Sequence, residues 1–452
     1  NISNYLSYYA TLDYSFDERY SLNSSIRWDA SNRFGEDKNA RYQPVWSVGL
    51  RYNFGREHFM KNQRIINDLS FRFSYGFQGN VSEAATPDLI AAIPGSGGVT
   101  VSDGEYYLTI SKLPNPTLKW EKNKSINLGV DFTLLNRHIS GTFEYYYKRG
   151  TDIVVNASVP HCNGVTSLTT NGGTMKNSGW ELSFNFVPLR LKEFVWTIGF
   201  NTSKNDNKVT SNLEQSITWQ KAAAGDLTRD GYPVSSFWAF AFTGLNEEDG
   251  APEFDFFDAE NDPNVKLDAT TYMKHMGKMD PDLSAGLSTS IRYKSFTLSA
   301  GFSLQIGGKK FLAPVFDDSM INTTPNEYNN LPKSLVNRWR KPSDKTNIPS
   351  LPYNKKGNTK LPDGQYTNIY RLYNYADIRV ADAWFLKCNN ISASYNFPER
   401  WIKGFAQNIN VNFSVSQPFR IVSKDFKGMD PEVAVGNQPI SRNYSLGINI
   451  SF

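Results

Sequence analysis

The chain lacks most of the features that identify common classes of protein. In 452 residues it has two cysteines, four histidines and a formal net charge of only +4. It contains no apolar run of about 18 residues, which argues against helical membrane spans. The small charge, without a basic tract or a zinc-ligand pattern, argues against a nucleic-acid partner. Aromatic residues, by contrast, are abundant, with 24 Tyr, 30 Phe and 10 Trp.

Two cysteines are too few for a disulfide framework. We expect Cys162 and Cys388 to be free thiols, with a bond between them as the alternative. Residues 1–5 contain neither an initiator methionine nor the start of a charged and then apolar export signal. An exported protein needs such a signal, so we expect this chain to be mature and incomplete.

The last nine residues alternate between two kinds of side chain. One face of a strand here would carry Tyr444, Leu446, Ile448, Ile450 and Phe452, and the other Ser445, Gly447, Asn449 and Ser451. A terminal strand of this kind, ending at an aromatic residue, is typical of bacterial outer-membrane β-barrels. In these barrels one face of each strand meets lipid and the other meets a polar lumen.

The same alternation recurs along the whole chain. A period of two predicts strands rather than helices. A strand of about 9–11 residues crosses a bilayer at a tilt. The thirteen predicted strands lie near 8–16, 20–28, 46–54, 69–77, 126–134, 139–147, 180–186, 196–200, 283–293, 296–306, 385–397, 409–415 and 444–452.

The connections between these strands alternate in length. Short turns are predicted near 16–19, 134–138, 191–194, 293–296 and 398–405, with a middling turn at 55–67. Long loops are predicted near 81–117, 159–175, 210–278, 312–380 and 422–438. Outer-membrane barrels have tight periplasmic turns and long external loops. Placing the C-terminus in the periplasm makes every short turn periplasmic.

The number of predicted strands is odd, whereas bacterial single-chain barrels have an even number. A barrel must close, because an unpaired edge in lipid leaves backbone groups without partners. The sequence therefore predicts an all-β fold, a transmembrane antiparallel β-barrel of which this chain is the C-terminal part. The edge near residues 4–16 is then expected to pair with a strand upstream.

A set of local motifs goes beyond these general features of a barrel. They are LPNPTLKWE at 113–121 followed by NLGVDF at 127–132, the hairpin 139–152, NSGWE at 177–181, GKMDPD at 277–282 with YKSFTLS at 293–299, FLKCNNISASYNFP at 385–398, GMDPE at 428–432 and SLGI at 445–448. In this order they resemble the signatures of the SusC/RagA-like TonB-dependent transporters of Bacteroidetes. The resemblance extends from about residue 113 to residue 452.

The resemblance implies a barrel of about 22 strands with an N-terminal plug, preceded by a segment that contacts TonB. It implies active import of a large nutrient, an oligosaccharide or a peptide, beneath a lid formed by a SusD-like surface lipoprotein. Neither plug nor TonB-contacting segment is found in this sequence, so no residue here is assigned to energy coupling. The alternatives are a passive porin and a structural or adhesive barrel. None of these is an enzyme.

No catalytic constellation is predicted. The four histidines lie on different loops and turns, and we expect them to be surface residues: His58, His138, His161 and His275. The acidic stretch 247–262 could supply carboxylate oxygens to Ca²⁺. Its spacing does not match a calcium-binding loop, and a solvated acidic loop is the favoured interpretation. The candidate ligands would be Asp249, Asp255, Asp258 and Asp262.

Aromatic and arginine side chains in the long loops are the candidates for contact with a ligand or a lid, because such residues dominate protein interfaces. They are Trp219, Trp238, Trp339, Arg338, Arg340, Tyr353 and Tyr366. Packing within the loops is the alternative, and it is favoured for Trp238 because the run 237–242 alternates like a hairpin. Four other tryptophans near strand ends are predicted to form membrane-interface girdles: Trp28, Trp46, Trp180 and Trp196.

Overall fold

The computed structural model describes most of the chain. The described residues are 5–31, 42–80, 89–92, 101–102, 105–106, 109–115, 118–159, 162, 167–210, 217–256, 268–322, 327–328, 330–352, 357–433, 438 and 440–452. Within them, no helix has both the length and the apolar character needed to span a membrane. The chain divides into two compact units, each described here by itself. The first comprises residues 1–185, 205–215 and 229–232, and the second 186–204, 216–228 and 233–452.

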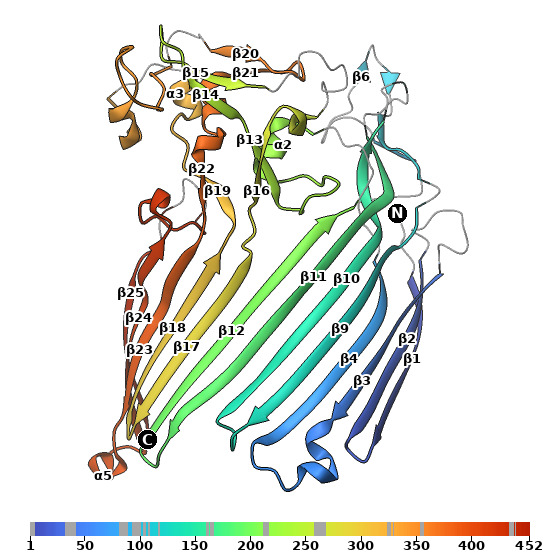
Figure 1. Ribbon diagram of the computed structural model, residues 1–452, viewed down its shortest axis with the longest axis vertical. Coiled ribbons are helices and arrows are strands. Elements are labelled where there is room, and N and C mark those ends of the chain that lie inside the picture. Colours follow the sequence, from blue (N-terminus) through green and yellow to red (C-terminus); the bar gives the residue numbers. More distant parts are fainter. Residues whose placement is uncertain are drawn as a thin grey trace. The chain divides into compact units, whose positions relative to one another are not determined.

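The dominant element is a thirteen-stranded sheet in the order β1-β2-β3-β4-β9-β10-β11-β12-β17-β18-β23-β24-β25 (Figure 1). Each strand lies beside the next long strand of the chain, as an up-and-down meander requires. The thirteen predicted strands are therefore confirmed. Their bounds are Tyr5–Phe16, Tyr20–Ser31, Tyr42–Asn53, Ile66–Asn80, Glu121–Leu134, Ile139–Ser158, Ser167–Arg190, Phe194–Val209, Leu283–Tyr293, Phe296–Ile306, Phe385–Asn396, Asn408–Val422 and Asn443–Ser451.

The large apolar side chains of the sheet are on an exposed face. In β25, Leu446 is 72% exposed and Ile448 62% exposed, and they lie opposite Phe413 and Val411 of β24. The outward residues of β1 behave in the same way, with Leu12 57% exposed. A sheet in water buries its apolar face, so this inverted pattern is the one expected of strands that face lipid.

Tight turns join the strands at the places where the sequence predicts them. In the turn between β1 and β2, Asp17 and Glu18 have φ values of 51° and 52°, and the amide of Arg19 donates to the carbonyl of Phe16. Positive φ at both central residues of this turn matches the right-handed twist of the flanking strands, and the whole connection has three residues, 17–19. Lys294, between β17 and β18, also has a positive φ of 51°.

Two of the predicted connections contain short helices. The middling turn at 55–67 holds η1 (Phe54–Arg56) and η2 (His58–Met60), and the turn after β23 holds α5 (Glu399–Ile402). The predicted loop 81–117 holds four short strands, β5 (Ile90–Ala92), β6 (Val101–Ser102), β7 (Glu105–Tyr106) and β8 (Thr109–Lys112). They form two two-stranded sheets, β5 with β8 and β6 with β7.

The predicted loop 159–175 is shorter in the structure. The strands β10 and β11 have 20 and 24 residues and leave only 159–166 between them. The amide of Asn171 in β11 holds this extension by donating to the carbonyls of Lys119 (2.8 Å) and Asp152 (2.7 Å). Strand ends outside lipid can be wetted on both faces, so they need no apolar alternation. The prediction, which relied on alternation, therefore ended β10 too early and began β11 too late.

In the second unit, the long segments between strands fold into a structure of their own, seen beyond the ends of β17 and β18 in Figure 1. The first contains α2 (Trp219–Ala224), β13 (Ser236–Ala239), β14 (Ala241–Leu245), β15 (Pro252–Asp255), η5 (Ala269–Thr271) and β16 (Lys274–Lys278). The second contains β19 (Lys309–Phe311), α3 (Asp318–Asn322), η6 (Lys333–Asn337), β20 (Asn358–Lys360), β21 (Tyr366–Asn368), α4 (Ile369–Tyr373), η7 (Asp377–Arg379) and β22 (Val380–Asp382). We call these two segments the outer segments.

A hydrophobic core lies within the outer segments rather than against the sheet. Its buried members are Val315, Phe316, Met320, Leu335, Tyr370 and Tyr373. The rings of Phe316 and Tyr370 meet edge to face with their centroids 5.2 Å apart. Phe242 and Phe254, from the other outer segment, pack against this cluster. The two outer segments are thus one packed structure and not separate flexible loops.

The polar face of the first unit carries an ion network. The guanidinium of Arg72 binds both carboxylate oxygens of Asp131 at 3.0 Å, and it also donates to Glu144. Arg51 lies 3.6 Å from the same aspartate. The guanidinium rests on Gly129, where an added Cβ would lie 3.0 Å from it. The glycine of the NLGVDF motif therefore makes room for a bidentate arginine–carboxylate pair.

A second polar cluster ties the strand ends to the turn at 54–65. Glu57 accepts hydrogen bonds from Arg19 at 3.0 Å, from the hydroxyl of Tyr20 at 2.9 Å and from that of Tyr52 at 3.1 Å. The two tyrosine rings are stacked, 5.2 Å between centroids. The hydrogen bond from Tyr20, followed by that from Arg19, holds the pKa of the Glu57 carboxyl below its usual value.

The lowered pKa of Glu57 predicts an acid-sensitive contribution to stability. The carboxylate is favoured in the folded state, so its contribution is complete above the unfolded pKa of about 4.5 and is lost as the pH falls through the lower, folded value. The thermal midpoint of the full-length protein is read from an electrophoresis gel, as the temperature at which the band of the folded barrel is lost. We expect this midpoint to fall more steeply below about pH 4.5 in the wild type than in Glu57→Gln. Glu399→Gln, at an exposed turn, is the control and should keep the wild-type slope. Equal slopes for wild type and Glu57→Gln would contradict the prediction.

Candidate functional site

The polar face of the second unit has a hollow of about 430 Å³, bordered by β12, β17, β18, β23 and the segment after β24. Its lining combines apolar side chains of Ala285, Leu287, Phe302, Leu304 and Phe385 with polar ones of Asn201, Ser203, Ser284, Ser303, Gln305, Asn389 and Glu432. Hydroxyl and amide groups both donate and accept hydrogen bonds. The surface is therefore suited to a neutral ligand rich in hydroxyl or amide groups.

Two glycines leave room for the amides of this face. An added Cβ at Gly286 would lie 2.8 Å from the amide oxygen of Asn201, and one at Gly301 would lie 2.7 Å from that of Asn390. The side chains fold flat over the strands because neither glycine carries a Cβ. Alternating small residues thus keep the hollow open.

A buried ion cluster borders the hollow. The ammonium of Lys387 in β23 lies 2.6 Å from a carboxylate oxygen of Asp430 and also binds Glu432. The Lys387 side chain is 4% exposed and that of Asp430 is completely buried. Arg420 and Lys310 reinforce the cluster, Arg420 at 3.8 Å from Asp430 and Lys310 by donating to the carbonyl of Pro431 at 2.8 Å.

This cluster fastens the segment after β24 to the sheet. The segment begins with η8 (Lys424–Phe426), turns at Lys427 and Gly428 with φ values of 49° and 83°, and presents Asp430 to Lys387. Glu432 is 46% exposed and so brings a carboxylate to the hollow. The motif at 428–432 is visible in the sequence, where no role is predicted for it. The one available signal was a charged residue, Lys387, within the predicted strand 385–397.

Two of the predicted contact residues, Trp219 and Trp238, are buried inside the outer segments. They are 3% and 2% exposed. The ring of Trp219 packs on Phe240 with 5.8 Å between centroids, and that of Trp238 packs on His275 at 5.0 Å. Their faces are covered by the chain itself. The structure therefore favours the packing alternative for both tryptophans.

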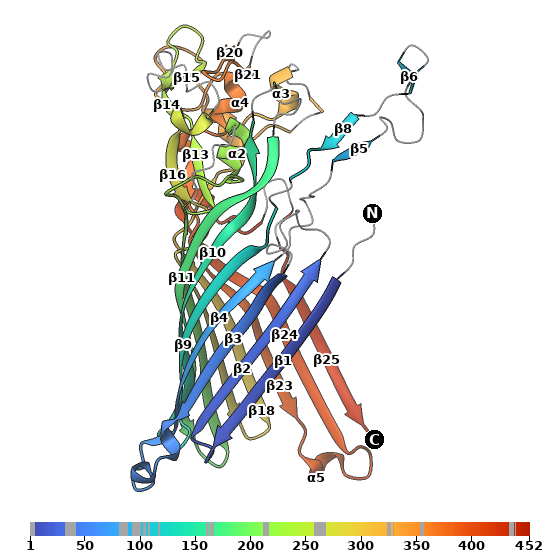
Figure 2. The same cartoon turned by 90° about the vertical axis from the view of Figure 1, so that its right-hand side faces the viewer.

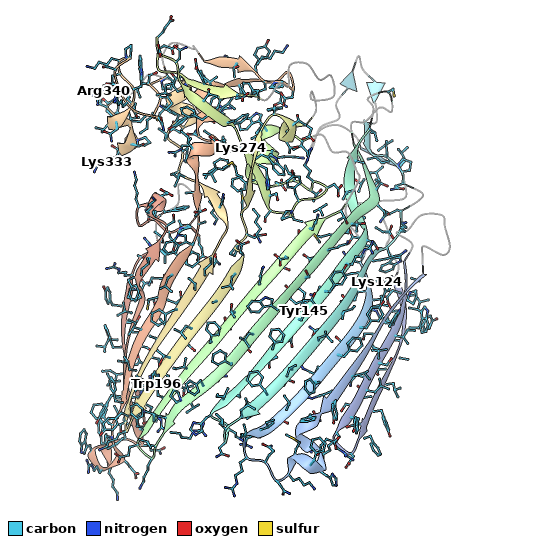
Figure 3. All side chains as sticks on the ribbon, in the orientation of Figure 1. Lys124, Tyr145, Trp196, Lys274, Lys333 and Arg340 are labelled. Atoms are coloured by element: carbon cyan, nitrogen blue, oxygen red, sulfur yellow. The ribbon has the colours of Figure 1, made fainter. Side chains whose placement is uncertain are left out.

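Phe240 joins the two outer segments. It is fully buried, its amide donates to the carbonyl of Tyr375 at 2.9 Å, and its carbonyl accepts from the amide of Asp377 at 2.9 Å. Lys274 of β16, labelled in Figure 3, adds an ion pair to Asp377 at 3.0 Å. The run 237–242 is expected to alternate like a hairpin; in the structure its two strands, β13 and β14, pair with β16 and β15 rather than with each other.

Trp339 and its arginine neighbours remain at the surface. The half-buried ring of Trp339 packs on Gly250, where an added Cβ would lie 2.2 Å from it. Arg338 and Arg340 line an open hollow of about 610 Å³ together with Lys341 and Lys345. We call this the basic hollow; Figure 3 labels Arg340 in it.

Tyr366 of β21 is 74% exposed and is thus available for contact. Tyr353 lies outside the described residues. Arg340 and Tyr366 are therefore the exposed residues among the predicted contacts, and Arg338 and Trp339 are partly exposed.

The calcium interpretation is not tested by the structure. Within the described residues, no three His, Cys, Asp or Glu side chains are grouped as a metal site. Asp249 accepts a hydrogen bond from the amide of Ala251 at 3.0 Å, and Asp255 lies in β15. Asp258 and Asp262 lie outside the described residues. A calcium site at these carboxylates stays a prediction.

The histidines and cysteines follow the sequence-based expectations where they are described. His58 lies in η2, His138 in the turn after β9 and His275 in β16, while His161 is outside the described residues. Cys162 is exposed and Cys388 is buried, and both are free thiols.

The predicted girdle tryptophans take different positions along their strands. Trp28 is near the end of β2 and 43% exposed, and Trp46 of β3 packs on Tyr75 with 5.3 Å between centroids. Trp196, near the start of β12, donates from its indole nitrogen to Thr289 at 2.9 Å (Figure 3). Trp180 lies well inside β11, because that strand is longer than predicted. The girdle itself stays a prediction.

Comparison with known families identifies the sheet. Residues 1–416 match the family described as TonB dependent receptor-like, beta-barrel. The chain belongs to this family. Its members are proteins of the outer membrane, and the all-β transmembrane fold predicted from alternation is confirmed.

Individual relatives extend the comparison. The chain is 28% identical to the TonB-dependent receptor SusC of Bacteroides thetaiotaomicron, over 99% of this chain and 44% of SusC. It is 25% identical to the TonB-dependent receptor P3 of Formosa agariphila, over 100% of this chain and 46% of the relative. The solved RagAB peptide transporter has the same fold, with a TM-score of 0.75, 23% identity and coverage of 100% of this chain and 48% of the transporter chain.

The resemblance to SusC/RagA-like transporters, inferred from local motifs, is thus confirmed. The chain spans about half the length of the relatives that it matches. These relatives are receptors and transporters rather than enzymes, as predicted.

The buried ion cluster predicts that Lys387→Met destabilises the segment after β24. The variant leaves Asp430 buried without its nearest cation, which costs about 3–5 kcal/mol for a buried pair. We expect faster cleavage near 423–433 by added protease in the folded full-length protein. The double variant Lys387→Met with Asp430→Asn removes both charges and should recover much of the resistance. Unchanged cleavage in the single variant would show that the cluster does not hold this segment.

The aromatic core predicts that Phe240→Ala loosens both outer segments together. Removing a fully buried phenylalanine costs about 3–5 kcal/mol. Limited proteolysis should then cut both outer segments, while the electrophoresis band of the folded barrel is retained. Tyr366→Ala, which removes an exposed ring from the same region, is the matched control and should leave the cleavage pattern as in wild type. Cleavage confined to one segment would disprove the joint core.

Proposed function

We propose that this chain forms the wall and outer segments of a TonB-dependent importer that takes a large nutrient, an oligosaccharide or a peptide, across the outer membrane. The observation that carries the proposal is a hollow on the polar face of the sheet, lined in part by hydroxyl and amide side chains and bordered by the fastened segment after β24. Family membership supplies the class of transport. TonB would act on a plug contributed by the remainder of the whole protein.

The orientation follows from the connections. In an antiparallel meander, alternate connections lie at the same end of the strands. All the tight turns therefore share one end of the sheet, and all the long segments share the other. Long segments are external in outer-membrane barrels. We therefore place the tight turns and the C-terminus in the periplasm and the outer segments outside the cell.

We assign the lid contact to the exposed part of the outer segments. Arg338 and Arg340 border the basic hollow, and Tyr366 is mostly exposed. Exposed arginine and tyrosine side chains are enriched among residues that dominate protein interfaces. A SusD-like surface lipoprotein would cover this region.

The charge of the polar hollow supports a neutral cargo. Lys387 is buried and paired with two carboxylates, and Glu432 leaves the hollow with an exposed carboxylate. Because Glu432 is itself paired with Lys387, the described lining offers no free cation to a polyanionic cargo. The amides and hydroxyls would instead bind sugar hydroxyls or peptide groups.

A lid assay and an uptake assay test the proposal on the full-length protein in its native membrane. The affinity-tagged protein should retain a surface lipoprotein, and Arg338→Glu with Arg340→Glu should weaken this complex by about 2 kcal/mol or more, as expected of interface hot spots. Lys192→Glu with Lys294→Glu, at the tight turns, is the control and should retain the lipoprotein.

Growth on separate oligosaccharides and peptides should depend on the TonB-contacting segment of the whole protein. Growth that survives its deletion would identify a passive porin. Absence of both a growth defect and a lipoprotein would favour a structural or adhesive barrel.

A further inference from the structure

The outward face of the first unit has an apolar groove that the proposed transport function does not use. The groove has a volume of about 560 Å³ and is bordered by β1, β2, β3, β4, β9 and β10. Its outward lining includes Leu22, Leu50, Phe71, Phe73, Leu128 and Phe143. Leu50 is 49% exposed and Phe143 41% exposed, on the face that the alternation assigns to lipid. Figure 2 shows the strands that carry this face.

One end of the groove is closed by a rigid pair of rings. Tyr20 and Tyr52 line the groove and stack on each other, and both hydroxyls are bound to Glu57. Arg19 holds the same carboxylate from the other side. These bonds orient the rings before any ligand arrives, so little side-chain freedom is lost on binding.

The turn beyond this end is amphipathic. Phe59 and Ile65 are 67% and 63% exposed, and Lys61 and Arg64 are exposed beside them. The ring of Phe54 connects the turn to the groove. It lies edge to face with Phe59 at 5.4 Å, with Tyr52 at 6.1 Å and with Phe71 at 6.3 Å, the last two being groove residues.

Three carboxylates near this turn are engaged by other groups. Glu57 binds the tyrosines and Arg19, Asp17 pairs with Arg19, and Glu18 pairs with Arg56. A fourth carboxylate, Asp68, lies beside Gly55, so the cations and carboxylates around the turn balance in number. The turn presents its exposed apolar side chains together with the two exposed cations Lys61 and Arg64. Such segments lie at the boundary between acyl chains and anionic head groups.

We propose that the groove and the turn 54–65 together bind one anionic phospholipid. An acyl chain occupies the groove between the outward side chains, and the phosphate lies against Lys61 and Arg64. The groove is continuous with the lipid-facing surface of the strands, and its cationic end complements an anionic head group. These two features specify a molecule with an apolar chain and a negative head, rather than a protein partner. We place this lipid in the inner leaflet of the outer membrane. This placement rests on the orientation given under the proposed function.

The acyl-chain part is tested by filling the groove. The full-length protein is released from nanodiscs made of phosphatidylcholine and phosphatidylglycerol. The phosphatidylglycerol molecules that stay bound to it are counted by native mass spectrometry. We expect Leu50→Trp to retain one phosphatidylglycerol fewer than wild type. Leu298→Trp, at an outward leucine of β18 that is 40% exposed, is the matched control and should retain the wild-type number. Equal numbers for Leu50→Trp and wild type would overturn the proposal.

The head-group part is tested by removing the cations. Lys61→Gln with Arg64→Gln should lower the preference for phosphatidylglycerol over phosphatidylcholine by about 30-fold, the combined contribution of two cations near an anionic surface. Lys192→Gln with Lys294→Gln, at two other tight turns, should keep the preference. An unchanged preference in the first variant would disprove the assigned phosphate contact. If the wild type instead retained a protein that Leu50→Trp loses, the occupant of the groove would be that protein and not a lipid.

The leaflet is tested separately. A maleimide that does not cross membranes should label Lys61→Cys only after the cells are lysed. Labelling of intact cells would overturn the proposed orientation and the inner-leaflet assignment, while the nanodisc result would still decide the groove. Both groove variants should take up nutrient as wild type does, so failure of the lipid proposal is distinct from failure of the transport proposal.

Discussion

The structure depends on one constraint, which is that a strand in lipid must pair its backbone groups with its neighbours and turn its apolar side chains outward. Every unpaired N–H or C=O in hydrocarbon costs several kcal/mol. Long antiparallel ladders meet this requirement, as in the nine pairs from Asn408↔Ser451 to Ser416↔Asn443 between β24 and β25. The result is a sheet whose apolar residues are exposed and whose polar face is free to be shaped for function.

A sheet of this kind cannot be stabilised by burying its apolar face against other parts of the protein. The stabilising contacts lie elsewhere. Polar groups crosslink the strands, as in the Arg72–Asp131–Glu144 network of the first unit. In the second unit, the aromatic core around Phe316 and Tyr373 makes the outer segments a packed structure. The long connections are therefore folded rather than left as open loops.

The positions of the candidate residues in the structure show how far residue type alone can predict a binding site. Tryptophans are equally suited to a core and to an interface, and only their surroundings decide between the two. Trp219 and Trp238 are covered by Phe240 and His275, whereas Trp339 lies half-buried on Gly250 beside two accessible arginines. The Lys387–Asp430 pair was not predicted at all, because its members lie far apart in the sequence and burial alone makes them a cluster.

The sequence by itself determined the fold class, the thirteen strands, their order and the positions of the tight turns. It could do so because a lipid-facing strand needs an outward apolar side chain at every second residue, as Tyr444 to Phe452 illustrate. The tertiary structure decided the rest. It extended β10 and β11 beyond the alternating stretch, since strands in water need no apolar face. It also joined the outer segments through Phe240 and assembled the hollow beside Glu432, because these depend on contacts between distant residues that no local pattern encodes.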